Sequence, residues 1–303
     1  MHILTEADLP LKEPVAMALG FFDGVHLGHQ ALLRKLKEQP ERTLAYTFDR
    51  KPSVPKPLFT SEERESLLAS AGIDMCFMAP FTPAFQEQSP RAFLRQIVHR
   101  FNVRAIVVGS DFRFGKHAAG DVVYLAEQAP KYGYRLVVVK VRGDDDRKYS
   151  SSSVRHLVSE GRIEEAEALM GHAYFVDGAV VSGAHVGRTL GFPTANVHTD
   201  KVLPAFGVYA TLTRTRDGLF PSVTNVGRRP TLDDGGAVSV ESYLLNHNEE
   251  MYGQHIRIYF VSRIRPEIKF RSLSDLRTQI EKDSQRARAL LSNSDIYTRH
   301  QLC

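Results

Sequence analysis

Two histidines, His26 and His29, lie in a glycine-rich run that follows an apolar run and precedes a helical pattern. This order predicts a strand, a tight turn and a helix. Glycine lets the backbone turn sharply and lets a ligand approach it closely, and the N-terminus of a helix attracts anions. The run therefore predicts a site for a polyanion, and a nucleotide triphosphate fits it best. Its residues are Gly20-Phe21-Phe22-Asp23-Gly24-Val25-His26-Leu27-Gly28-His29.

The two imidazoles of this turn have several possible roles. A structural turn between a strand and a helix is common, but it does not need two histidines. Zinc binding is less favoured, because the spacing is not the i, i+4 spacing of a helical metal pair and no Cys or Glu lies close by. Donation of hydrogen bonds to phosphate oxygens in a transition state suits the spacing better.

A second polar turn, residues 109–116, combines glycines with two phenylalanines and two cations. One interpretation is a platform for a flat ring, with Asp111 accepting hydrogen bonds from that ring. The alternative is a basic surface loop whose phenylalanines pack into the core.

A serine run, residues 150–153, precedes helical patterns at 156–160 and 163–170. Hydroxyls and backbone N–H groups at the start of a helix, with Arg155 one turn further on, would form a cradle for an anion. A serine-rich N-cap that binds no ligand is the alternative.

The second half of the chain contains a loop, residues 183–196, whose glycines could fold over phosphates. Thr194 and Asn196 offer hard oxygen ligands suited to Mg²⁺. Glu241 lies in an apolar strand pattern, where a solvent-facing carboxylate is the common explanation. It is a general-base candidate because the phosphate loop lies in the same half.

The elements that must position these residues differ between the two halves. In the first half, strands and helices alternate, which indicates a parallel sheet covered on both faces. Ligands of such sheets bind at the carboxyl ends of the strands, where the turns 20–29, 48–52 and 109–120 fall. We expect strands at 15–19, 44–48, 75–78, 105–109 and 135–141, and helices at 30–36, 61–71 (capped by Ser61), 90–101 and 121–132.

From Tyr174 onward, β-branched and aromatic runs follow one another without helices between them, which favours an antiparallel barrel or sandwich. A last helix, 274–291, closes this half with Leu276, Ile280 and Ala287 on one face. The boundary is expected near 171–173, which gives domains 1–172 and 173–303. The expected strands are 175–181, 208–215, 220–226, 238–245 and 255–261.

The composition narrows the class of protein. The chain has 303 residues, enough for two domains, with 43% hydrophobic and 24% charged residues, as is usual for soluble globular proteins. The net charge of +4 suits anionic small molecules and is too weak to indicate nucleic acid. Two cysteines give no disulfide framework or metal cluster, which fits a reducing cytoplasm. The charged N-terminal segment predicts no signal peptide, and no apolar run suits a membrane helix.

These runs together resemble one family, the bacterial bifunctional riboflavin kinase/FMN adenylyltransferase, also called FAD synthetase. The resemblance extends over essentially the whole chain. The motifs that carry it in the first half are residues 20–29, residues 108–115, and Ser150-Ser151-Ser152 with Arg155. In the second half they are residues 191–196, 207–209, 225–227, 230–231, Glu241 and 264–266.

The resemblance implies an α/β, Rossmann-like nucleotidyltransferase domain with a parallel sheet, followed by an antiparallel β-barrel domain with a terminal helix. It also implies two reactions. The second domain would transfer the γ-phosphate of ATP to riboflavin, giving FMN. The first domain would then transfer AMP from ATP to FMN, giving FAD and pyrophosphate.

The resemblance further implies roles for individual residues. In the kinase, Glu241 would take the hydroxyl proton of riboflavin, while Thr194 and Asn196 would hold Mg²⁺. In the adenylyltransferase, His26 and His29 would stabilise the transition state, and Arg155 would hold pyrophosphate with the serines. The phosphate-binding residues would be Gly20, Phe21, Asp23, Gly24, Gly28, Ser150, Ser151, Ser152, Gly183, Gly187, Arg188 and Gly191, and the flavin-binding residues Asp111, Phe112, Gly207, Tyr209 and Arg265.

The chain departs from the family's motifs at two places. Residues 48–52 read Phe-Asp-Arg-Lys-Pro where the family usually has Pro-His-Pro or Asn-His-Pro, and Ser152 stands for the usual threonine. One alternative function is therefore a riboflavin kinase with an impaired adenylyltransferase, and another is a flavin- or nucleotide-binding regulator. We expect small-molecule nucleotides and flavins as partners, no nucleic acid, no membrane, and a monomer or weak homo-oligomer.

Overall fold

The computed structural model describes residues 1–50, 54–140, 149–182, 191–228, 238–247 and 251–292. The chain divides into two compact units, residues 1–151 and 152–303, and each has its own sheet. Helices α6 (Ser151–Ser159) and α7 (Ile163–Met170) follow the division, and α7 packs against strands of the second unit. The boundary at 171–173 lies after these helices and stays a prediction.

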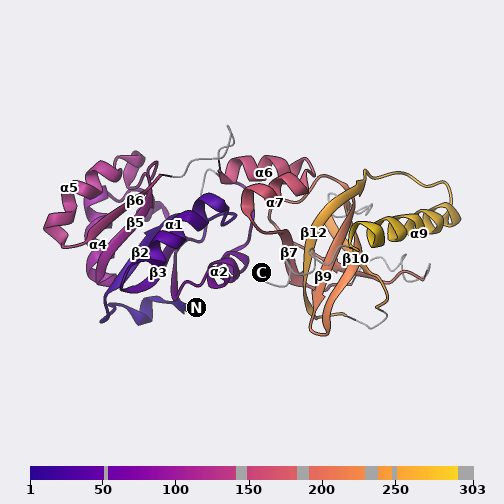
Figure 1. The fold of residues 1–303 in the computed structure, drawn as a ribbon, viewed down its shortest axis with the longest axis horizontal. Helices are drawn as coiled ribbons and strands as arrows, with labels where there is room; N and C mark the ends of the chain where they lie inside the picture. The colour runs from indigo at the N-terminus through magenta and orange to yellow at the C-terminus, as the bar shows by residue number, and fades with distance from the viewer. Residues whose placement is uncertain (51–53, 141–148, 183–190, 229–237, 248–250, 293–303) are drawn as a thin grey trace. The chain divides into compact units, whose positions relative to one another are not determined.

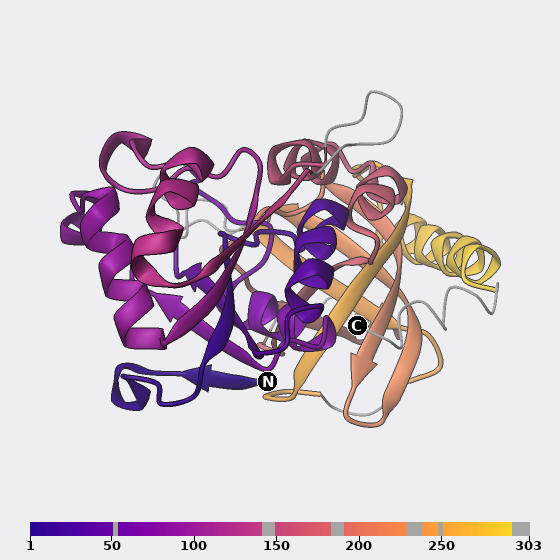
Figure 2. The same cartoon turned by 60° about the vertical axis from the view of Figure 1, so that its left-hand side comes forward.

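The first unit is built on a six-stranded parallel sheet, as the alternating pattern predicts. Apart from two 3₁₀ turns and the short helix α3 (Pro83–Gln86), its helices are α1 (Leu27–Lys37), α2 (Ser61–Ser70), α4 (Pro90–Phe101) and α5 (Val122–Tyr132). Figures 1 and 2 show α4 and α5 on one face of the sheet and α1 on the other. In spatial order the strands are β1 (His2–Leu4), β4 (Met75–Ala79), β3 (Arg42–Phe48), β2 (Val15–Leu19), β5 (Val103–Gly109) and β6 (Arg135–Val139).

Strand β2 lies at the centre of this sheet, and all five of its residues are buried. The next strand in the chain, β3, pairs with one side of β2, whereas β5 pairs with the other side. The connections therefore change direction at β2, and ligands of such sheets bind beside the carboxyl ends of the strands at this point. The turns after β2, β3 and β5 all begin at this edge, as the sequence predicts.

The helix ends follow capping chemistry, with one correction to the expected caps. Thr60, not Ser61, is the N-cap of α2: its hydroxyl accepts from the N–H of Glu63, whose carboxylate accepts from the N–H of Thr60. Ser61 is the first helical residue instead. Ser89 caps α4 as expected, with Pro90 at its first position.

The second unit is a six-stranded antiparallel sheet that curls until its edges meet, which confirms the barrel class. Val181, just after β7, donates its N–H to the carbonyl of Asn196 on β8 at 2.9 Å. Strand β8 is a correction, because the sequence pattern placed these residues in a loop. In spatial order the strands are β7 (Tyr174–Ala179), β12 (His255–Arg265), β9 (Gly207–Thr215), β10 (Gly218–Arg228), β11 (Val238–Leu244) and β8 (Thr194–Val197).

Helix α9 (Leu273–Leu290) lies against the outside of the curled sheet and contacts β9, β10 and β12 (Figures 1 and 2). Leu276 and Ile280 are partly buried and Ala287 is fully buried, which confirms the predicted apolar face. Asp283 is also buried on this face. A carboxylate at such a position needs a partner, and that partner belongs to a site described below.

Candidate active sites

The turn after β2 contains several residues in the left-handed region of backbone space. Phe22, Gly24 and Val25 have φ angles of 51°, 95° and 35°. Such angles cost roughly 1–3 kcal/mol for residues other than glycine, and the surrounding structure must hold them. Phe22 and Val25 are both buried, and a Cβ on Gly24 would lie 3.0 Å from Cδ1 of Leu58. The backbone of this turn is therefore fixed by packing.

The histidines of this turn stack on each other at the start of α1. Their ring centroids are 3.8 Å apart and the planes differ by 17°. His26 is the N-cap, and its Nδ1 accepts the N–H of His29 at 3.3 Å. An accepting Nδ1 carries no proton, so this contact assigns the proton of a neutral His26 to Nε2. The structure thus brings together both predicted histidines at a helix N-terminus.

His29 is held in its uncharged form by its surroundings. Burial, and secondarily the nearby ring of His26, lowers the pKa of His29 well below its ordinary value. Its Nδ1 is buried without a hydrogen-bond partner among the described residues. Buried polar atoms are normally satisfied, and an orphaned one indicates a contact that a bound molecule or water would complete. A phosphate oxygen or a water is a suitable partner for an imidazole nitrogen.

Hydrogen bonds of Asp23 and Ser151 hold the same turn in place. The carboxylate of Asp23 is fully buried and accepts the N–H groups of Leu58 and Phe59 at 2.8 and 3.3 Å. The hydroxyl of Ser151 donates to the carbonyl oxygen of Asp23 at 2.6 Å. Among the residues predicted to bind phosphate, Asp23 therefore has a carboxylate that accepts main-chain hydrogen bonds of the protein itself. Ser151 is hydrogen-bonded directly to the turn.

The other predicted anion-binding residues are distributed as follows. Gly28 is buried in the first turn of α1, and Gly20 directly follows β2. Ser150 precedes α6, while Ser152 and Arg155 lie on that helix, with Ser152 exposed and Arg155 half-buried. The serines therefore occupy the start of a helix, as predicted. The residues Gly183, Gly187 and Arg188 lie outside the described residues.

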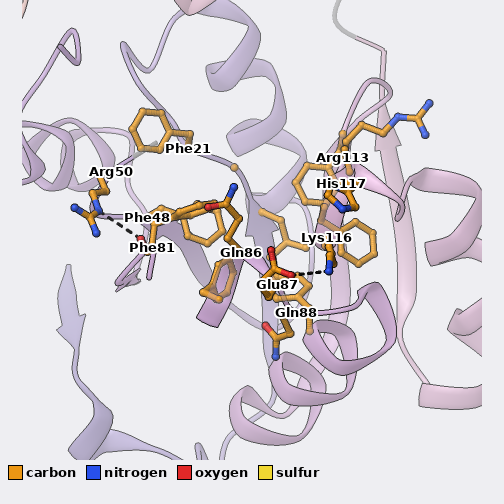
Figure 3. Close-up of a pocket in the computed structure, with 18 of the residues that line it drawn as sticks. Phe21, Phe48, Arg50, Phe81, Gln86, Glu87, Gln88, Arg113, Lys116 and His117 are labelled. Atoms are coloured by element: carbon orange, nitrogen blue, oxygen red, sulfur yellow. Dashed lines mark hydrogen bonds and ion pairs between the residues drawn. The ribbon is translucent and has the colours of Figure 1, made fainter. Parts of the chain in front are cut away.

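A cavity of about 670 Å³ opens beside the histidine turn and includes Gly20 and Phe21 from it. Its other walls come from the ends of β2 and β3, from α3 and the residues beside it, from Phe93 of α4 and from the turn 111–118 that follows β5. Figure 3 shows Phe21, Phe48 and Arg50 on one side, and Arg113, Lys116 and His117 on the other. The phenylalanines that line it are Phe21, Phe48, Phe81, Phe85, Phe93, Phe112 and Phe114.

Aromatic walls of this kind suit a large flat ring. Phe112 stacks on Phe114 with centroids 5.6 Å apart and an 18° tilt between the ring planes. Asp111 is an exposed lining residue of the same cavity. The structure therefore places the predicted flavin residues of the first half together. Phe81 and Phe85 were not predicted, because they come from a short segment with no motif of its own.

Several cations also line this cavity, and most are paired. Lys116 contacts Glu87 at 2.6 Å, and Arg113 contacts Asp121 at 2.9 Å. Arg50 donates from Nε to the carbonyl of Phe81 at 3.4 Å. Arg50 belongs to the unusual run 48–52 and lies at the wall of the cavity, whereas Lys51 and Pro52 lie outside the described residues.

The second unit has a separate cavity of about 260 Å³ beneath α9. Strand register places Asn225 of β10, Glu241 of β11 and Asn196 of β8 in one row. Side chains two residues apart share a face, so Thr194 and Tyr243 lie on this face as well. Glu241, Thr194 and Asn225 line the cavity, and Ser239 donates to Glu241 at 3.2 Å. Of the predicted residues Glu241, Thr194 and Asn196, the first two therefore line the cavity. Asn196 is buried and pairs with Glu241 across the sheet.

The remaining predicted residues of the second half have different surroundings. Arg265 lines the cavity and donates to the buried carboxylate of Asp283 through Nε and Nη2. Tyr209 is fully buried, pairs with Thr224 rather than Asn225, and therefore faces away from Glu241. Gly207, with φ of 155°, is needed because a Cβ would lie 2.5 Å from the carbonyl of Arg265. Gly191 is exposed.

Comparisons with known proteins match each half of the chain to a family of its own. The model of the FAD synthetase family matches residues 9–153, and that of riboflavin kinase matches residues 170–291. Bifunctional riboflavin kinase/FMN adenylyltransferases from Listeria monocytogenes and Bacillus subtilis are 37% and 36% identical, each over 91% of this chain and 92% of the relative. This chain belongs to the bifunctional riboflavin kinase/FMN adenylyltransferase family.

A solved structure covers the same two units. The crystal structure of a protein named as a macrolide-efflux protein from Streptococcus pneumoniae has a TM-score of 0.85 and 26% identity, covering 95% of this chain and 99% of the other. The FAD synthetase match contains the histidine turn and the phenylalanine cavity, and the riboflavin kinase match contains the Glu241 cavity. Among the described residues, none of the helices is long and apolar enough to cross a membrane.

Proposed function

We propose that this member of the family converts riboflavin to FMN in its second unit and FMN to FAD in its first. The observation that carries the proposal is the pairing of an aromatic cavity with the histidine turn. Phe21 and Gly20 belong to both, so a flavin ring in the cavity would lie beside phosphates on the turn. The second cavity provides a carboxylate and oxygen donors, as a phosphoryl transfer to a hydroxyl requires.

In the kinase reaction, Glu241 accepts the proton of the riboflavin 5′-hydroxyl as the oxygen attacks the γ-phosphorus of ATP. The half-buried carboxylate in the row with Asn225 and Asn196 is the support for this role. The bond that forms joins the hydroxyl oxygen to phosphorus, and ADP leaves. Positioning and charge neutralisation supply most of the catalysis of such transfers.

Mg²⁺ is implied by the reaction, and the residues fit it. Thr194 and Asn196 provide a hydroxyl and an amide oxygen on one face of β8, opposite Tyr243 and Glu241. Hard oxygen ligands are those that Mg²⁺ prefers. A bound Mg²⁺ would offset negative charge on the nucleotide phosphates, while Thr194 and Asn196 orient it.

In the adenylyltransferase reaction, an FMN phosphate oxygen attacks the α-phosphorus of ATP and pyrophosphate leaves. No protein nucleophile is needed, because the FMN phosphate is already an anion. His26 and His29 donate hydrogen bonds to the oxygens that gain charge, and such donors are typically worth about 100-fold or more in rate. Ser150, Ser151, Ser152 and Arg155 hold the pyrophosphate at the start of α6. Asp111 and Phe112 contact the flavin.

The Arg265 guanidinium is directed to Asp283 and therefore positions α9 over the kinase cavity. We propose that Arg265 affects riboflavin binding only indirectly, by placing α9. We further propose that Gly207 and Tyr209 support the strand that forms this side of the flavin site. We also propose a cytoplasmic location and a monomer or weak homo-oligomer, in line with the cysteine content and composition.

A product assay tests the two activities together. The purified chain is incubated with riboflavin, excess ATP and Mg²⁺, and products are separated by chromatography over time. FMN should appear first and then convert to FAD. Accumulation of FMN without FAD would instead favour a kinase with an impaired adenylyltransferase. Arg50, which replaces a residue of the family's motif at the cavity wall, is the structural reason to test this alternative. Absence of both products would favour a binding regulator.

A further inference from the structure

Arg64 on α2 is a buried cation, and among the described residues it makes no hydrogen bond to a carboxylate. Its side chain is 1% exposed, and burial lowers its pKa. A buried charge is costly unless hydrogen bonds satisfy it. Its two Nη atoms do find acceptors: main-chain carbonyls, hydroxyl groups and, at 3.9 Å, the Sδ of Met78, whereas its Nε has no hydrogen-bond partner among the described residues.

The contacts of Arg64 join the carboxyl ends of β2 and β3. Nη1 donates to the carbonyl oxygen of Phe21 at 3.0 Å and to Oγ1 of Thr47 at 3.3 Å. Nη2 donates to the carbonyl oxygen of Asp49 at 3.1 Å and to Oγ of Ser61 at 3.3 Å. The guanidinium also lies 4.6 Å from the centroid of the Phe21 ring. Phe21 is thus held at both its carbonyl and its ring.

The carbonyl of Phe21 is fixed twice, because Thr47 also donates its hydroxyl to it at 2.9 Å. The peptide that contains this carbonyl leads into Phe22, whose φ of 51° is unfavourable for a residue with a side chain. A residue in this conformation relaxes unless its neighbours hold it. Arg64 and Thr47 are the hydrogen-bond donors that act on the preceding carbonyl.

Phe22 in turn sets the position of His29. The two rings meet edge to face with centroids 5.3 Å apart, and Phe22 is fully buried. We infer that Arg64, assisted by Thr47, is a positioning residue for adenylyl transfer: it holds the Phe21 carbonyl, which keeps Phe22 in its strained conformation and His29 in place. This inference rests on the proposed role of His29.

The same strand provides a matched control. Thr43 lies at the amino end of β3, is 5% exposed, and contacts Asp74 through its hydroxyl at 2.8 Å. Thr47 lies at the carboxyl end and is fully buried. Thr43→Val and Thr47→Val therefore each remove one buried hydroxyl from the same strand. Only Thr47→Val removes a hydrogen bond to the Phe21 carbonyl.

The experiment measures FAD formation from supplied FMN and ATP, and FMN formation from riboflavin, with the full-length chain. The variants are Arg64→Met, Arg64→Lys, Thr47→Val and Thr43→Val, each alone and combined with His29→Ala. For Arg64→Met we expect kcat of FAD formation to fall by about 100-fold, as for small misplacements of a catalytic group. Arg64→Lys and Thr47→Val should show smaller losses, the KM for FMN should change less than kcat, and FMN formation should persist.

In the His29→Ala background the losses caused by Arg64→Met, Arg64→Lys and Thr47→Val should disappear, because the group that they position is gone. If the losses stay additive, Arg64 does not act through His29 and the inference fails while the role of His29 stands. If His29→Ala itself leaves FAD formation unchanged, both fail. If Arg64→Met does not fold, Thr47→Val decides: a kcat loss no larger than that of Thr43→Val overturns the inference.

Discussion

Arg265 of β12 and Asp283 of α9 form a two-pronged ion pair, in which Nε and Nη2 lie 3.0 and 2.8 Å from Oδ2 of the carboxylate. The side chains are only 17% and 4% exposed. This pair fastens α9 over the Glu241 cavity, and a second polar contact joins Nη2 of Arg288 on α9 to Oδ1 of Asn246 at 2.9 Å. Arg265 and Asp283 are 18 positions apart in the sequence, and neither belongs to a local pattern that predicts the pair.

We predict that Asp283→Ala weakens the second unit and its reaction together. Removing one partner of a buried ion pair leaves the other charge uncompensated and costs about 3 kcal/mol or more. FMN formation should therefore fall, while FAD formation from supplied FMN continues. The control is Glu281→Ala on the exposed face of α9, where the pair with Arg277 is 52–63% exposed and worth at most about 1 kcal/mol. Equal thermal shifts for the two variants would contradict the prediction.

Glu241→Gln should abolish FMN formation and leave FAD formation from supplied FMN unaltered. The amide keeps the shape of the side chain and can still interact with Ser239, but it cannot accept a proton from the hydroxyl. Loss of a general base lowers kcat by about 100-fold or more. Both rates are measured on one preparation, so the adenylyltransferase reports correct folding. A variant that retains half of its kinase rate would exclude Glu241 as the base.

His26 has two roles that substitutions can separate. It caps α1 through Nδ1 and presents an imidazole in the turn. His26→Ala should lose both, and loss of an N-cap costs about 1 kcal/mol. His26→Ser keeps a capping oxygen and should lose only the imidazole. We therefore expect FAD formation to fall in both variants, but thermal stability to fall only in His26→Ala. A fully active His26→Ser would show that the ring serves the helix alone.

Much of this architecture follows from local pattern. The run 15–19 matches β2 without error, and Ser89-Pro90 opens α4 as predicted, because buried parallel strands and caps have strong local signals. Strand β8 was missed because four residues after a glycine-rich loop carry little periodicity, and only pairing with β11 makes them a strand. The cap of α2 shifted by one residue because Thr60 and Ser61 are chemically equivalent candidates.

The site residues also divide into those that local sequence reveals and those that only the fold reveals. The histidines and Glu241 could be found from residue type and spacing, since their chemistry depends on a few local positions. Arg64 and Asp283 could not, because their importance comes from acceptors and donors on other elements. Tyr209 was expected near the flavin from its motif, but strand register turns its side chain to the opposite face from Glu241. A motif identifies a neighbourhood, and the register decides which side chains face the cavity.

The lowered pKa of His29 predicts a specific dependence of stability on pH. In the unfolded chain the ring takes up a proton as pH falls through about 6.5, whereas the half-buried ring in the folded protein does so only at lower pH. The free energy of unfolding should therefore be independent of this group above pH 6.5. Below it, stability should fall by up to about 1.4 kcal/mol per pH unit, until the folded ring also titrates.

The measurement compares the wild type with His29→Gln between pH 5.5 and 7.5. Urea unfolding of the full chain is followed by pulse proteolysis, and peptides from β2 and β3 are detected by mass spectrometry so that only the first unit is observed. The difference between the two proteins removes the contributions of other titrating groups. We expect the wild type to lose stability more steeply toward low pH, because the folded unit disfavours the charged form of His29. Parallel pH curves would show that His29 takes up its proton as readily in the folded unit as in the unfolded chain.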